Sequence, residues 1–289
     1  MSIATVLLTL TILAQSNSPS AGMILGLSGK ATLQRGNAQS NASLAELLQT
    51  GDRIRVETGN LTFLFCPTSE RIVLSAGTSI ELQADAVRIV GGSQPTREKT
   101  KCALPQVALG KENLERFGGV RGRGNPPISL LTGGPLTTIR PVFEWVPMAG
   151  SPTYQLTVKN GDDDVVWQEQ TSGAKLAYPA SMPALAPGMY SWEVRAQEGG
   201  KTVGEQRANF EVKPAAGLSV GNAKDAGAML LEAISLENEG YFSEAATYFR
   251  ELQKLDPTDD RIARRLAWLY WNAGLIAATN DQMQRLSKQ

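Results

Sequence analysis

Three adjacent carboxylates, Asp162, Asp163 and Asp164, are the one place where acidic side chains cluster in this sequence. Carboxylate oxygens are ligands that calcium prefers, so a loop folded around an ion could bring the three together. Neighbouring residues on an extended chain, however, point to opposite faces. Asn160 and Gly161, which precede them, are typical of a hairpin turn. We therefore expect a hairpin tip here, and calcium binding stays open.

An alternative is that the chain is an envelope enzyme that acts on polysaccharides, with the acidic pair Asp52 and Glu70 as its catalytic residues. Carboxylate pairs hydrolyse glycosides when they flank the scissile bond. Asp52 follows Gly51 in a predicted turn, where an aspartate commonly bonds to its own backbone. The sequence has no histidine, which removes the commonest general base and a usual zinc ligand. We predict no catalytic residue, no metal and no cofactor.

Phosphate and nucleic-acid binding find no support in the pattern of glycines and charges. Residues 118–127 are rich in glycine, but no Gly-Lys-Ser/Thr closes a phosphate-binding loop. Basic and acidic residues number 28 each and are scattered, which is not the footprint of a nucleic-acid-binding protein. We interpret residues 106–130 as a linker, with Arg121 and Arg123 solvated.

The N-terminus has the pattern of a secretory signal. Residues 3–14 are largely apolar and residues 15–20 are polar, and the apolar run is too short to span a bilayer. The small residues between Ala14 and Gly22 suit signal-peptidase cleavage, so residues 1–21 are predicted as a signal peptide. No Lys or Arg precedes the run, which leaves three alternatives: a misplaced start codon, an atypical signal, or a buried strand or helix. We expect an exported protein, periplasmic or extracellular, without a further transmembrane helix.

Cys66 and Cys102 are the only cysteines. An even pair in an oxidising compartment can close a loop of about 36 residues, worth about 4 kcal/mol on the chain-entropy estimate. Cys102 directly follows the polar stretch 97–101, where a free thiol has no apolar surroundings to favour it. We favour a disulfide, with two separate buried thiols as the alternative.

Residues 22–105 alternate apolar and polar positions between turn residues, as in Ile54 and Val56 or Ile72 and Leu74, which predicts a stack of short strands. The stretch 48–55, with Gly51 and Asp52, and the later stretch 74–82 resemble the FecR-like periplasmic domain. That resemblance implies an extracytoplasmic β domain. In the family a hairpin of Asp, Gly and Ser links two strands, and here residues 66–69 take its place. The chain lacks the family's cytoplasmic anti-sigma segment, so signal relay is not implied.

Residues 131–214 show a second set of strands, with aromatic and β-branched residues on one face and polar residues on the other. This pattern is typical of a two-sheet sandwich. The stretch 185–196 resembles the tyrosine-corner strand of fibronectin type III and related immunoglobulin-like domains. The resemblance implies that Tyr190 bonds back across the corner. We assign Trp145 and Trp192 to the core.

Residues 215–289 change to a spacing of three or four, as in Ala245, Phe249 and Leu252, which predicts amphipathic helices. Residues 240–257 resemble a tetratricopeptide repeat, and the same frame returns 34 residues later at Gly274. The resemblance implies about two helical hairpins and a protein-binding surface. Two hairpins are fewer than such arrays usually need. Their apolar edge must therefore be covered by the sandwich, by a second copy or by a partner.

Trp268, Tyr270 and Trp271 cannot all face one side of a helix. Tyr270 fits the repeat core, whereas Trp268 and Trp271 share another face. We predict that these two tryptophans bind protein, either a partner in the cell envelope or a second copy. The sequence thus predicts a multidomain fold of two all-β modules followed by helices, acting as an exported, non-catalytic binding or scaffold protein. A ligand sensor is a further alternative.

Overall fold

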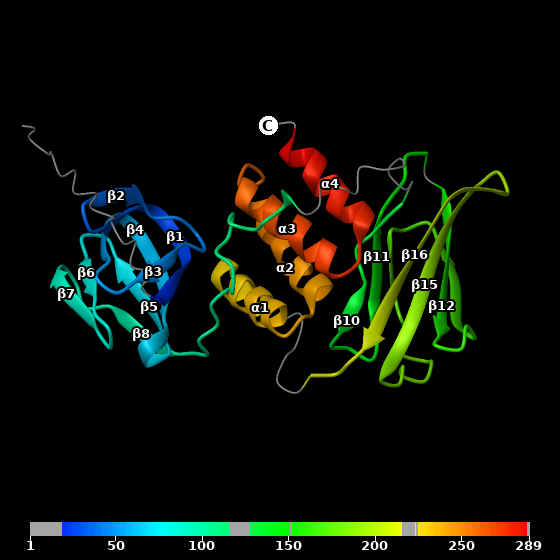
Figure 1. Cartoon of the computed structure of the whole chain (residues 1–289), viewed down its shortest axis with the longest axis horizontal. Coiled ribbons are helices and arrows are strands. Elements are labelled where there is room, and N and C mark those ends of the chain that lie inside the picture. The colour runs from blue at the N-terminus through cyan, green and yellow to red at the C-terminus, as the bar shows by residue number, and fades with distance from the viewer. Residues whose placement is uncertain (1–18, 116–127, 151, 216–222, 224, 288–289) are drawn as a thin grey trace, which may run out of the picture.

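The four helices lie between two β-rich parts, with the N-terminal strands on one side and the later strands on the other (Figure 1). The computed structural model describes residues 19–115, 128–150, 152–215, 223 and 225–287. Most of the predicted signal peptide, and Arg121 and Arg123, lie outside the described residues. Among the described helices, none has the length and apolar character needed to cross a bilayer.

The N-terminal β domain is one antiparallel sheet folded around its own core. Its elements are β1 (Ser20–Arg35), β2 (Ala38–Asn41), β3 (Leu47–Gln49), β4 (Arg53–Phe65), the 3-10 turn η1 (Cys66–Thr68), β5 (Glu70–Ser75), β6 (Ser79–Leu82), β7 (Val87–Gly91) and β8 (Thr96–Lys99). The main strand order is β2-β1-β4-β5-β8. β4 pairs with β6 through its first residues and with β5 through its last, so it belongs to two parts of the sheet.

The alternating pattern of this domain is explained by burial on one face. Ile54, Val56, Ile72 and Leu74 are all at most 1% exposed and share one core. Because successive strand residues point to opposite faces, the polar residues between them face away from this core. The β-rich prediction for this region is confirmed.

The second β part is a sandwich, built from β9 (Ser129–Leu130), β10 (Gly134–Leu136), β11 (Val142–Val146), β12 (Thr153–Asn160), β13 (Val165–Thr171), β14 (Lys175–Ala177), β15 (Gly188–Glu198) and β16 (Lys201–Val212). One sheet has the order β10-β16-β15-β12-β13 and the other β14-β11-β9. β10 runs parallel to β16, and the other pairs are antiparallel. This is an immunoglobulin-like arrangement. β9 lies within the stretch predicted as linker.

The sandwich core contains the aromatic residues that the sequence placed there. Trp145 and Trp192 are almost fully buried, with ring centres 6.2 Å apart. The Tyr190 hydroxyl donates a hydrogen bond of 2.9 Å to the Ala186 carbonyl, which is the predicted bond across the corner. Trp192 donates from its ring nitrogen to the Thr132 carbonyl at 3.0 Å, so the buried indole is satisfied.

The helical array consists of α1 (Ala226–Asn238), α2 (Phe242–Leu255), α3 (Asp260–Asn272) and α4 (Ile276–Leu286). Gly240 and Gly274 have φ of 87° and 75°, a conformation in which a side chain is strained. Each ends a helix with the same bond, from the next residue's N–H to a carbonyl five positions back. The first helices of the two hairpins therefore end in the same way, at glycines 34 residues apart.

Candidate functional site

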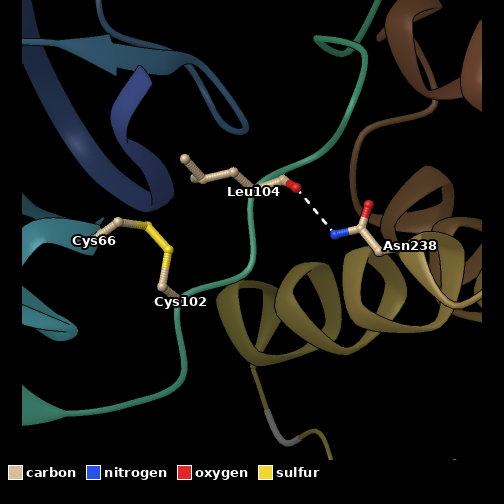
Figure 2. Close-up of a disulfide and its surroundings, with 4 residues drawn as sticks. All are labelled: Cys66, Cys102, Leu104 and Asn238. Atoms are coloured by element: carbon tan, nitrogen blue, oxygen red, sulfur yellow. Dashed lines mark hydrogen bonds between the residues drawn. A yellow bond between two sulfur atoms is a disulfide. The ribbon is translucent and has the colours of Figure 1, made fainter. Parts of the chain in front are cut away.

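An extended segment, residues 103–115, runs over the helical array and is called here the covering segment. It begins at the Cys66–Cys102 disulfide, whose Cα atoms are 5.2 Å apart. The predicted disulfide is thus present in the structure. Figure 2 shows that the segment passes α1 two residues later, where the Asn238 side chain donates to the Leu104 carbonyl at 3.0 Å. The disulfide therefore joins the N-terminal domain to the start of the covering segment.

Arg265 of α3 fixes the middle of the covering segment. Its side chain is 1% exposed and pairs with Glu112 at 2.8 Å and with Glu237 of α1 at 2.7 Å. It also donates to the Val107 carbonyl. A buried cation is tolerated only when it is paired and hydrogen-bonded, and here one guanidinium joins the segment, α1 and α3.

This cluster holds two carboxylates against one guanidinium. Burial raises the pKa of Glu237 to about 7 even though Arg265 lowers it, and burial likewise raises the pKa of Glu112. The buried Oε2 atom of each carboxylate has no hydrogen-bond partner in the described residues. Burial of two carboxylates beside one guanidinium therefore disfavours the ionisation of both at once.

Trp268 and Trp271, the predicted protein-binding residues, lie under the end of the covering segment. Leu114 is buried with Ala267, and both tryptophans pack against this pair. Trp268 also contacts Phe242 edge-on at 5.5 Å and lies under the Arg265 guanidinium. Both rings are half-buried. The apolar edge of the array is thus covered partly by the chain itself, and protein binding by the two tryptophans stays a prediction.

The other faces of the helical array contact both β parts. The first turn of α1 approaches β1 so closely that a methyl group on Gly227 would lie 2.8 Å from the Leu25 carbonyl oxygen. On the opposite side, Ser243 of α2 donates to the Gly133 carbonyl at 2.6 Å. Met23, Leu25 and Leu64 belong to the same apolar cluster as the cores of the array and the sandwich, so packing continues through all three parts.

A groove lies between the outer face of the β14-β11-β9 sheet and α2. Its volume is about 660 Å³, within the range of ligand-binding pockets. It is lined by Leu131, Thr132, Leu136, Thr137, Thr138, Ile139, Arg140, Pro141, Val142, Glu144, Lys175, Pro214, Ser243, Glu244 and Thr247. Two of its apolar residues, Ile139 and Val142, are 42% and 40% exposed. We take this groove as the candidate binding site.

Glu244 is the buried acid of the groove. It lies in the first turn of α2 and is 8% exposed. Its carboxylate accepts hydrogen bonds from the Thr137 N–H at 3.0 Å and from the Thr137 hydroxyl at 3.1 Å. Burial raises the pKa of Glu244 to about 7, against the smaller lowering by these bonds. The carboxylate also ties α2 to the sandwich.

The structure does not bring Asp52 and Glu70 together. Asp52 lies just before β4 and is held by Arg35, at 2.7 Å and 2.9 Å, and by the Gln49 N–H at 2.8 Å. Glu70 pairs in the sheet with Phe65, at the far end of β4. A hydrogen bond from Thr68, followed by contacts from Lys99 and Arg97, lowers the pKa of Glu70. Asp52 therefore has the turn role that its sequence position predicts.

Asp162, Asp163 and Asp164 form the tip of the hairpin between β12 and β13. The Asn160 side chain accepts from the Asp162 and Asp164 N–H groups at 3.0 Å and 2.9 Å. In the part of the chain that the structure describes, no cluster of three or more acidic or thiol side chains could hold a metal. The turn prediction is confirmed for these residues.

The groove residues were missed in the sequence because no local pattern marks them. The sheet side comes from residues 131–142 and the helix side from Ser243, Glu244 and Thr247. Glu244 lies on α2 between the small residues Ser243 and Ala245. A charged residue in such a helix is normally expected to face solvent. The available signal was the threonine-rich stretch 132–138, which precedes the apolar strand β11.

No protein-family model and no curated protein matches this sequence. Matches among solved structures include CopC from Methylosinus trichosporium OB3b, with 16% identity over 32% of this chain and 99% of that chain and a TM-score of 0.23. FN3tt matches with 10% identity over 30% of this chain and 95% of that chain, TM-score 0.24. The FN1-FN3 domains of chicken CNTN1 match with 12% identity over 64% of this chain and 57% of that chain, TM-score 0.25. TM-scores this low do not establish a shared fold. The immunoglobulin-like assignment therefore rests on the strand order of the sandwich and on the hydrogen bond of Tyr190.

Replacing Gly227 with alanine tests the contact between α1 and the N-terminal domain. Gly to Ala in a helix usually stabilises by about 1 kcal/mol. Here the added methyl group would meet the Leu25 carbonyl, 2.8 Å away, so we expect a lower melting temperature than wild type. The measurement is thermal unfolding followed by circular dichroism, and a raised melting temperature would show that α1 does not pack on β1.

The pH dependence of stability tests the buried acid of the groove. The folded pKa of Glu244, about 7, exceeds its ordinary value of 4.5, so its contribution is fully present below pH 4.5 and is lost as pH rises through 7. The Glu244→Gln side chain stays neutral at every pH. We therefore expect the free energy of unfolding of this variant to exceed that of wild type at pH 8 by up to about 3 kcal/mol, and the difference to vanish at low pH.

Urea unfolding at pH 5, 6, 7 and 8 measures this difference. The matched control is Glu251→Gln on the same helix, because Glu251 forms an exposed pair with Lys254 and should show little pH-dependent change. A Glu244→Gln variant less stable than wild type at pH 8 would mean that the ionised carboxylate holds the joint together.

Proposed function

We propose that this chain is a non-catalytic binding or scaffold protein of the bacterial cell envelope, periplasmic or extracellular. It acts through protein–protein contacts of its helical end and its β modules. The groove between the sandwich and α2 is the observation that carries the proposal, because it presents half-exposed Ile139 and Val142 beside polar groups. Apolar surface with a few placed polar groups is typical of a binding site.

The family resemblances belong to the same proposal. We assign the N-terminal domain to the FecR-like class on its Gly51-Asp52 turn and following strands, and the helical array to the tetratricopeptide-like class on its 34-residue repeat. Trp268 and Trp271 are a second candidate contact, because part of each ring remains exposed beside the covering segment.

Export is supported by the Cys66–Cys102 disulfide, since such bonds persist in oxidising compartments and are rare in the cytosol. The predicted signal peptide, residues 1–21, would direct the chain to the secretory pathway. A ligand sensor is the second candidate function, because the groove touches both the sandwich and the helical array. A molecule bound there would contact both parts at once.

Site-specific photo-crosslinking in the native host tests compartment and partner together. A photoreactive residue replaces Ile139 in the groove or Trp271 at the covered edge, and the control position is Val165, 54% exposed on β13. We expect the protein in the periplasmic or extracellular fraction with a processed N-terminus. We also expect discrete adducts from Ile139 or Trp271 and not from Val165.

Adducts with the same chain would indicate self-association. A cytosolic protein with both thiols free, or equal adducts from all three positions, would contradict the proposal. If no adduct forms and an envelope sugar raises the melting temperature, the sensor is the better description.

A further inference from the structure

Glu244 is a buried acid that the described residues provide with no cation. Among the described residues, its oxygens accept hydrogen bonds only from the N–H and hydroxyl of Thr137, and it forms no ion pair. Oxygen Oε2 accepts one hydrogen bond, from the Thr137 N–H, and a carboxylate oxygen can accept two. The carboxylate therefore keeps a free acceptor site while it lines the groove.

Such a carboxylate is unfavourable without a partner of opposite charge. Burying an ionised group costs several kcal/mol unless it is paired. The neutral donors from Thr137 offset only part of this cost, which agrees with the raised pKa of about 7. A cation entering the groove would restore the ionised form and would be paired at low solvent exposure.

The groove lining contains three other charged groups, of which two are bound within the protein and one is exposed. Arg140 donates to the Pro179 and Met182 carbonyls. Glu144 is paired with Arg250 of α2. Lys175 is exposed on β14. The remaining walls are partly apolar, with Leu131, Leu136, Ile139, Pro141, Val142 and Pro214, and partly polar, with threonines such as Thr138 and Thr247. Glu244 is therefore the one carboxylate of the lining that has no cation partner among the described residues.

The sheet beside the groove has an open edge. Within the described strands, β14 pairs only with β11, so its other side presents unpaired backbone groups. Lys175 of β14 also lines the groove. An extended segment can pair with such an edge while one of its side chains enters the adjacent groove.

We propose that the groove binds an extended, apolar segment of a partner protein that carries a lysine or arginine, with its cation on Glu244. This inference rests on the proposed protein-binding function and names the chemistry of the partner. The buried carboxylate selects the cation, the exposed Ile139 and Val142 contact the flanking apolar residues, and the β14 edge holds the backbone.

The test is a random 12-residue peptide library displayed on phage and selected in parallel at pH 8 on wild type, Glu244→Gln and Glu205→Gln. Glu205 is an exposed acid on β16 that pairs with Arg195, away from the groove lining. We expect wild type and Glu205→Gln to enrich peptides with Lys or Arg between apolar residues, and Glu244→Gln to lose that enrichment.

Isothermal titration calorimetry with a synthetic copy of an enriched peptide measures how much Glu244 contributes to the affinity. We expect at least a tenfold weaker affinity for Glu244→Gln, and a similar loss when norleucine replaces the peptide's cation. Wild-type affinity should fall between pH 8 and pH 6, because protonation of Glu244 removes the charge that the peptide needs. The Glu244→Gln affinity should not depend on pH in this range.

A second variant guards against misfolding of the first. Ile139→Lys changes a half-exposed wall residue, so folding should persist while the added positive charge repels the peptide. Identical enrichment on wild type and Glu244→Gln, enriched peptides without a cation, or no enrichment at all would overturn the inference. Displacement of the peptide by hexylammonium at a lower concentration than the peptide itself would also overturn it in favour of a small-ligand site.

These failures differ from failure of the proposed function. Discrete adducts from Ile139 in the native host, together with no effect of Glu244→Gln on peptide selection, would leave the binding function standing and remove only the cation requirement.

Discussion

The structure depends on covering the apolar faces of a helical array that is too short to bury them itself. Repeat helices are stable when neighbours stack on both sides, and four helices leave both ends open. This chain supplies the neighbours from its own β parts and from the covering segment. Arg265 is central, because its burial requires Glu112 from the segment and Glu237 from α1. The modules are therefore parts of one packed unit.

The same packing buries two groups of carboxylates that outnumber their cation partners. Glu112 and Glu237 share one arginine, and in the part of the chain that the structure describes Glu244 is bound only by the neutral donors of Thr137. The first cluster is enclosed by the covering segment and has a structural role. Glu244 faces a groove of about 660 Å³, so a ligand can reach it. Accessibility, and not charge alone, separates a structural joint from a candidate binding site.

Local patterns were sufficient for the elements and insufficient for their assembly. Period-two alternation predicts the strands. The corner strand predicts the hydrogen bond of Tyr190, which the structure contains, and Gly240 and Gly274 predict the two helix ends. Residues 106–115 belong to the stretch 106–130, whose composition, rich in glycine and proline over 118–127, predicts a linker. Their role comes from partners far away in sequence, such as Arg265 for Glu112. The groove has the same origin, since Thr137 and Glu244 meet only after folding.

Hydrogen exchange measured by mass spectrometry on the full-length protein tests the central claim most directly. If the covering segment and the two β parts hold the helices, the slowest amides of α2 and α3 should exchange with the same opening free energy as those of β11 and β15. Global unfolding then exposes them together. Helical amides that exchange at a much lower free energy than the sandwich strands would show an independent, loosely attached array and would contradict the account.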